Sequence, residues 1–129
     1  MNAVKHLPVV FLIAALVALS TAAMAQGLSP DKLPRFEKAA QRCGVFAGAY
    51  YRCVDRAPSK IDLAKAGVLR WMRDYGADEL QILELGMRFD LGERRMQSVG
   101  CGEVSPEQKA QAERTLAACL AGDGSLVGN

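Results

Sequence analysis

The chain has 129 residues, of which 50% are hydrophobic and 23% are charged. Its 16 Lys and Arg residues against 14 Asp and Glu residues give a net charge of +2. A charge so near neutral argues against nucleic acid or anionic lipid as the main partner, since both select a basic patch.

The first 25 residues have the pattern of a cleaved secretory signal. Lys5 gives a basic start, an apolar run follows from Leu7 to Leu19, and Ala23-Met24-Ala25 supplies the small residues of a cleavage site. The alternative is an uncleaved membrane anchor, but the run is shorter than the roughly 20 residues that a spanning helix needs. We therefore expect cleavage after Ala25. Residues 26–129 then form a single periplasmic or secreted domain with no stable membrane anchor.

Residues 34–57 carry two of the four cysteines and have the apolar periodicity of an α-helix. Apolar residues recur there at spacings of four and three: Phe36, Ala40, Cys43, Ala47, Tyr50, Val54 and Ala57. On such a helix Cys43 and Cys53 lie about 15 Å apart, whereas a disulfide needs Cα atoms within roughly 7 Å. Each must therefore bond Cys101 or Cys119, or remain a free thiol. Four cysteines in an exported chain predict two disulfides formed in an oxidising compartment.

Start and stop signals divide the domain into four helices. The first ends before Pro58, because a residue that precedes proline is pushed out of the helical region. Ser59 begins the second with a sequence like a capping box, Asp78 caps the third, and Ser105 opens the fourth. The predicted fold is all-α, a small disulfide-stapled four-helix bundle of up-down-up-down topology. Its helices span about residues 33–56, 59–75, 78–99 and 105–121.

The third helix has apolar residues on nearly every side, which predicts that it is the most buried of the set. One stripe consists of Leu80, Leu83, Met87 and Leu91, and another of Ile82, Leu85 and Phe89. Gly92 predicts a bend or break, because glycine destabilises a helix by about 1 kcal/mol relative to alanine. Two pairs have the spacing of ion pairs within this helix, Glu84 with Arg88 and Asp90 with Arg94.

The helix geometry also selects the disulfides. Cys101 and Cys119 are too far apart to pair, since Cys119 lies about 21 Å into its helix and the loop reaches back only about 13 Å. If the first and last helices are antiparallel, Cys43 lies level with Cys119 and Cys53 lies level with Cys101. We therefore predict Cys43–Cys119 and Cys53–Cys101. A break at Gly92 that reverses the last helix would instead pair Cys43 with Cys101 and Cys53 with Cys119.

Many chemistries are absent from the exported sequence. Its only histidine, His6, belongs to the signal, which removes histidine nucleophile systems, histidine-ligated haem and histidine zinc sites. There is no Cys-x-x-Cys for thiol exchange and no glycine motif for a phosphate. The sequence thus predicts no metal and no cofactor.

The spacing Cys43-x9-Cys53 resembles one half of the twin Cys-x9-Cys helical hairpins of the mitochondrial intermembrane space. The other two cysteines are spaced Cys-x17-Cys, and a cleaved signal is foreign to that group. The resemblance therefore covers one helix, and the chain is not assigned to the family.

Several residues are of the types that dominate protein interfaces: Trp71, Arg70, Arg73, Tyr51, Arg94 and Arg95. The alternative is a half-buried tryptophan with solvated arginines. Asp74, Asp78 and Glu79 crowd one turn and are the candidates for acid-base catalysis, although capping and nearby arginines give them structural uses.

We expect an exported, non-catalytic module that binds another exported or envelope protein, such as an inhibitor, immunity protein, chaperone or accessory factor. Two alternatives remain open. A carrier of a small apolar ligand would need a cavity of about 300 Å³ or more between the helices. A carboxylate-based hydrolase would use the acidic turn.

Overall fold

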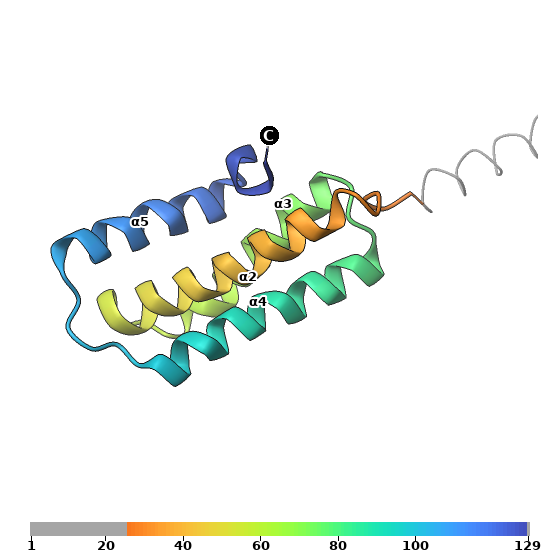
Figure 1. Cartoon of the computed structure of the whole chain (residues 1–129). Coiled ribbons are helices and arrows are strands. Elements are labelled where there is room, and N and C mark those ends of the chain that lie inside the picture. The colour runs from red at the N-terminus through yellow and green to blue at the C-terminus, as the bar shows by residue number, and fades with distance from the viewer. Residues whose placement is uncertain (1–25, 129) are drawn as a thin grey trace, which may run out of the picture.

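The computed structural model describes residues 26–128, which form four α-helices, a short π-helix and a 3₁₀ turn, with no strand. The signal peptide predicted for residues 1–25 lies outside the described residues. The helices are α2 (Leu33–Ala49), α3 (Lys60–Asp74), α4 (Glu79–Val99) and α5 (Pro106–Ala121). In Figure 1, α2 and α4 run in one direction, and α3 and α5 run back. The all-α bundle with two disulfides agrees with the prediction.

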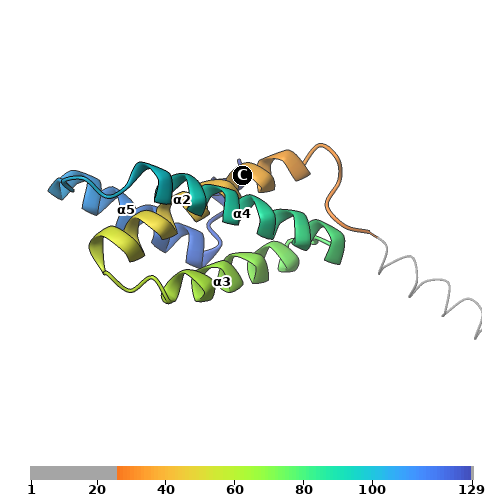
Figure 2. The same cartoon turned by 90° about the horizontal axis from the view of Figure 1, so that it is seen from below.

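The central element is α2. Figure 1 shows it between α5 and α4, and Figure 2 shows α3 along a further side. Its apolar stripe supplies Phe36, Ala40, Cys43 and Ala47, none of them more than 4% exposed. The other helices meet this stripe with the largest fully buried side chains outside α2, which are Phe89, Met72, Leu85, Val68 and Cys119. One core thus forms around α2.

The backbones of α2 and α4 touch at two glycines. A Cβ atom added at Gly44 would overlap the carbonyl oxygen of Phe89, and one added at Gly92 would overlap that of Gln41. Because glycine has no Cβ atom, Gly44 and Gly92 allow the two helices to approach more closely than any other residue would permit. α4 runs without interruption through Gly92, so the predicted break is wrong. The glycine serves close packing, which offsets its helix-destabilising cost.

Two disulfides join α2 and the π-helix that extends it to α5 and the loop before α5. Cys43 bonds Cys119 with a Cα–Cα distance of 5.7 Å, and Cys53 bonds Cys101 with a distance of 5.3 Å. These are the pairings expected from helix geometry. The first bond is fully buried in the core, whereas Cys101 is exposed at the surface. Two such bonds indicate that the chain folds in an oxidising environment.

Side-chain caps begin two of the helices. Asp78 and Ser105 cap α4 and α5, as predicted, and each forms a capping box, with Gln81 and Gln108 respectively. Ser59 makes no cap hydrogen bond at the start of α3, so the capping box predicted there is wrong. Its backbone is helical (φ −62°, ψ −21°), whereas a capping serine normally needs an extended backbone to reach the exposed amides.

The first helix does not continue as an α-helix to residue 56. After Ala49 it widens into a π-helix, Tyr50–Val54, in which the Asp55 amide donates to the Tyr50 carbonyl at 2.8 Å. Arg56 then ends it with a left-handed backbone (φ 54°). Lys60 donates to the Asp55 carboxylate at 3.0 Å, and this hydrogen bond raises the pKa of Lys60 above its ordinary value.

The last residues described pack against the core. They form a 3₁₀ turn at Gly124–Val127, in which the Asp123 carboxylate accepts from the Ser125 amide. Val127 is 3% exposed and belongs to the core.

The glycine contact predicts opposite effects of alanine at two helical glycines. Gly44→Ala should lower the free energy of unfolding by about 1–3 kcal/mol, since overpacking displaces α4. The control Gly67→Ala, whose new Cβ would meet only a Leu120 methyl at 3.7 Å, should raise it by up to about 1 kcal/mol. Urea denaturation with intact disulfides measures both. Stabilisation by both substitutions would contradict the close contact.

Candidate functional site

The outer side of α4 carries a row of apolar side chains, Leu80, Leu83, Met87 and Leu91, which we call the α4 face. The first three are 79%, 67% and 69% exposed, and Leu91 is partly exposed. Their spacing places them on one side of the helix as a continuous stripe. The prediction that α4 is the most buried helix is therefore wrong for this stripe.

The second apolar stripe of α4 is the one that enters the core. Ile82, Leu85 and Phe89 are 7%, 0% and 1% exposed. Because α2 approaches α4 on the side of Gly92, it covers this stripe and leaves the opposite side in solvent. Scattered exposed leucines are ordinary on a protein surface, but a contiguous apolar stripe marks an interaction site.

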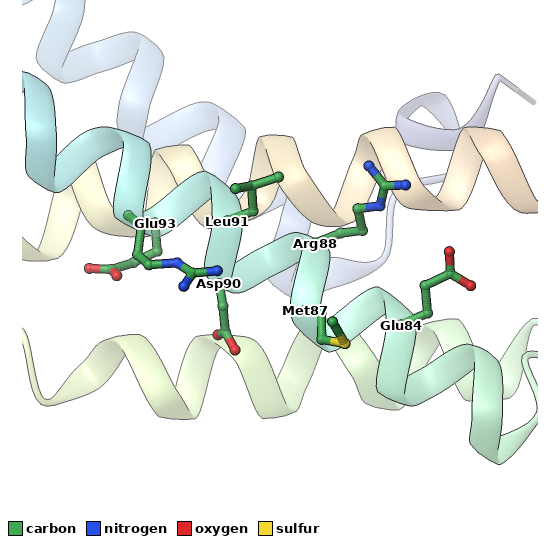
Figure 3. Close-up of a pocket in the computed structure, with 7 residues that line it drawn as sticks. Glu84, Met87, Arg88, Asp90, Leu91 and Glu93 are labelled. Carbon is green, nitrogen blue, oxygen red and sulfur yellow. The ribbon is translucent and has the colours of Figure 1, made fainter.

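Ion pairs hold α4 on both sides of this face. Arg88 pairs with Glu37 of α2 at 3.0 Å, and Asp90 pairs with Lys65 of α3 at 2.9 Å. Figure 3 shows Arg88 directed toward α2 and Asp90 directed toward α3. The pairs predicted within α4 are therefore wrong, because partners on neighbouring helices take Arg88 and Asp90.

Two charged residues at the border of the α4 face, Glu84 and Arg94, are not used in ion pairs among the described residues. Both are exposed. A hollow of about 610 Å³ runs along this side of the helix (Figure 3), lined by Glu84, Met87, Arg88, Asp90, Leu91, Glu93 and Arg94. All of these residues belong to α4, so the hollow is a shallow depression on one helix and not an enclosed ligand site. Such a depression is suited to contact with the surface of another protein.

Trp71, predicted as an interface residue, lies in the core instead. It is 8% exposed, and its indole Nε1–H donates to the carbonyl oxygen of Cys119 at 2.7 Å. That carbonyl lies in the last turn of α5, where backbone acceptors lack a helical partner. Gly122, left-handed at φ 70°, ends α5 directly against the indole. Trp71 thus closes the end of α5.

The other predicted interface residues are dispersed. Arg94 and Arg95 are exposed on α4, Arg70 is exposed on α3, and Tyr51 is half-buried in the π-helix with its ring 5.2 Å from that of Tyr50. Arg73 bonds Glu79 at 3.1 Å. Only Arg94 and Arg95 therefore border the α4 face, and its apolar members were missed as surface residues.

The acidic turn has structural partners. The Asp78 carboxylate accepts from the Gln81 amide at 2.8 Å in the capping box. Glu79 pairs with Arg73, and Asp74 is exposed at the end of α3. Gln81 in turn joins this turn to Leu28, whose amide donates to the Gln81 side chain at 2.8 Å. The arrangement anchors the start of the described chain to α4.

A buried carboxylate that the sequence analysis missed lies on α4. Glu93 is 9% exposed and accepts hydrogen bonds from Arg52 at 2.6 Å and from Gln97 at 2.7 Å. Arg52 belongs to the π-helix, so the pair ties that turn to α4. The four-residue spacing of Glu93 and Gln97 is a signal for their hydrogen bond within the helix. The hydrogen bond from Arg52 has no such signal, because Arg52 is distant in sequence.

An apolar hollow lies beside the Cys53–Cys101 bond. Its volume is about 180 Å³, smaller than the cavity expected of a carrier, and it is lined by Phe46, Ala49, Cys53, Val54, Met96, Cys101, Val104, Gln108, Gln111 and Ala112. Within the described residues, no cluster of three or more potential metal ligands occurs. Each helix between residues 26 and 128 is too short or too polar to cross a bilayer.

Comparisons with protein-family models, with curated proteins and with solved structures give no match for this chain.

The burial of Trp71 predicts a stability effect without a binding effect. Trp71→Phe removes the indole donor and leaves the Cys119 carbonyl unsatisfied, which should lower the free energy of unfolding by about 1–3 kcal/mol. Denaturant titration measures the loss, and capture of protein partners at low temperature should be unchanged. A variant of full stability with impaired capture would show that Trp71 acts in binding.

Proposed function

We propose that this chain is an exported, non-catalytic module that binds another protein through the α4 face. In this proposal the chain is released from a cleaved signal peptide and folds as an up-down-up-down bundle in the periplasm or outside the cell. The observation that carries it is the exposure of Leu80, Leu83 and Met87 together on one helix.

Two features support a binding role for this face. A stripe of large apolar side chains in water has an unfavourable free energy that a partner surface relieves. The scaffold beneath it is rigid, because the glycine contact fixes α4 against α2 and the buried Cys43–Cys119 bond fixes α2 to α5. A rigid face loses little conformational freedom on binding, which favours affinity.

The charged border supports specificity. Glu84 lies beside the amino half of the stripe, and Arg94 and Arg95 lie beside its carboxyl half. A partner surface should therefore offer apolar side chains with positive charge at one end and negative charge at the other, since complementary charges select orientation.

Two leucines of similar exposure, Leu83 on α4 and Leu63 on α3, test the proposal. Leu83→Glu on the α4 face should reduce capture of proteins from cell-envelope extract at least tenfold, which is about 1.4 kcal/mol, because it places a charge within the apolar stripe. The control Leu63→Glu, at a 73% exposed position on α3, should leave capture unchanged. Quantitative mass spectrometry of the bound fraction measures both. Equal capture by the two variants would reject the α4 face.

A further inference from the structure

We propose that the partner on the α4 face is a second copy of this chain, with the two α4 helices packed side by side and antiparallel. This inference rests on the proposed function, because it names the occupant of the same face. It commits to a twofold dimer in which the same residues of both copies meet.

The apolar stripe fits its own antiparallel image. Consider a twofold axis perpendicular to α4 that passes the α4 face at the level halfway along the helix between Glu84 and Arg95. On an ideal helix, Met87 then lies about 4 Å to one side of that level and Leu91 about 2 Å to the other. Both therefore meet Met87 and Leu91 of the second copy at the centre of the contact. Leu83 lies about 10 Å from the axis, toward the edge of the apolar contact.

The charges fit the same arrangement. Glu84 and Arg95 are eleven residues apart, about three turns, so both lie on one edge of the face. The antiparallel pairing places Glu84 opposite Arg95 of the second copy, twice per dimer. On the other edge Arg94 lies opposite Leu83 of the second copy, where its aliphatic stem covers the leucine.

A parallel pairing would have the opposite effect, because its twofold axis runs along the helices and sets one edge of the face against the other edge. Glu84 would then lie beside Leu83 of the second copy, and Arg95 would lie beside Arg94. Like charges in direct contact oppose association. The acidic start and basic end of the face therefore select the antiparallel dimer.

The charges that this dimer uses are available in the single chain. Within residues 26–128, Glu84 and Arg95 have no ion-pair partner, whereas Arg88 and Asp90 are already bonded to α2 and α3. One helix against one helix gives an interface in the small class, so we expect a reversible dimer whose population rises with protein concentration.

Charge reversal gives a direct test by analytical ultracentrifugation of the exported chain over a range of concentrations. The wild type should show a monomer–dimer equilibrium. Glu84→Arg alone and Arg95→Glu alone should each weaken dimerisation at least tenfold, because each homodimer then holds two like-charge contacts. An equimolar mixture of the two variants should regain wild-type affinity, since every reversed side chain then faces an opposite charge.

The control Arg70→Glu reverses an exposed charge on α3 and should leave dimerisation unchanged. All three positions are exposed, so the circular dichroism and the melting temperature of the monomer should match the wild type. A wild type that stays monomeric throughout, or a mixture no tighter than its single variants, would overturn the dimer. If Leu83→Glu still abolishes capture from envelope extract in that case, the occupant is a different protein and the proposed function stands.

Discussion

The bundle depends on the direct backbone contact between α2 and α4 at Gly44 and Gly92. Each glycine admits a carbonyl oxygen of the facing helix where any side chain would overlap it. The two helices therefore behave as one packed pair, and α3 and α5 fill the remaining sides of α2. The buried Cys43–Cys119 bond then joins α5 to this pair at its core.

This contact also decides what the surface offers. α4 has apolar residues on two sides, and a helix that approaches at backbone distance can cover only one of them. Ile82, Leu85 and Phe89 enter the core, while Leu80, Leu83 and Met87 remain outside. Ion pairs from α4 to α2 and α3 brace the helix at both edges. The α4 face is therefore apolar, exposed and held in place by the neighbouring helices, which is the physical basis for proposing a protein-binding role.

Local rules predicted much of this fold, because they act within a few residues. Helix starts at Asp78 and Ser105 follow from capping chemistry, and the pairing of the cysteines follows from helix rise and loop reach. Ser59 does not cap α3 as capping chemistry predicted, because its backbone is already helical.

The misassigned features depend on tertiary neighbours. Periodicity shows that α4 has two apolar stripes but not which one α2 covers, so Leu83 was expected inside. The burial of Trp71, an interface candidate on α3, depends on its contact with the end of α5. The ion pairs of Arg88 and Asp90 and the burial of Glu93 depend likewise on residues far along the chain. The π-helix combines local hydrogen bonding with a disulfide from Cys53 to a distant loop.

The most direct measurement is a nuclear Overhauser spectrum of the oxidised chain, read at the α protons of Gly44 and Phe89. The Cβ position of Gly44 lies 3.1 Å from the Phe89 Cα atom, so a strong cross-peak between these α protons is expected. Its absence, with contacts from Gly44 to α3 or α5 instead, would contradict the account, because a different helix would then cover α2 and a different side of α4 would face the solvent.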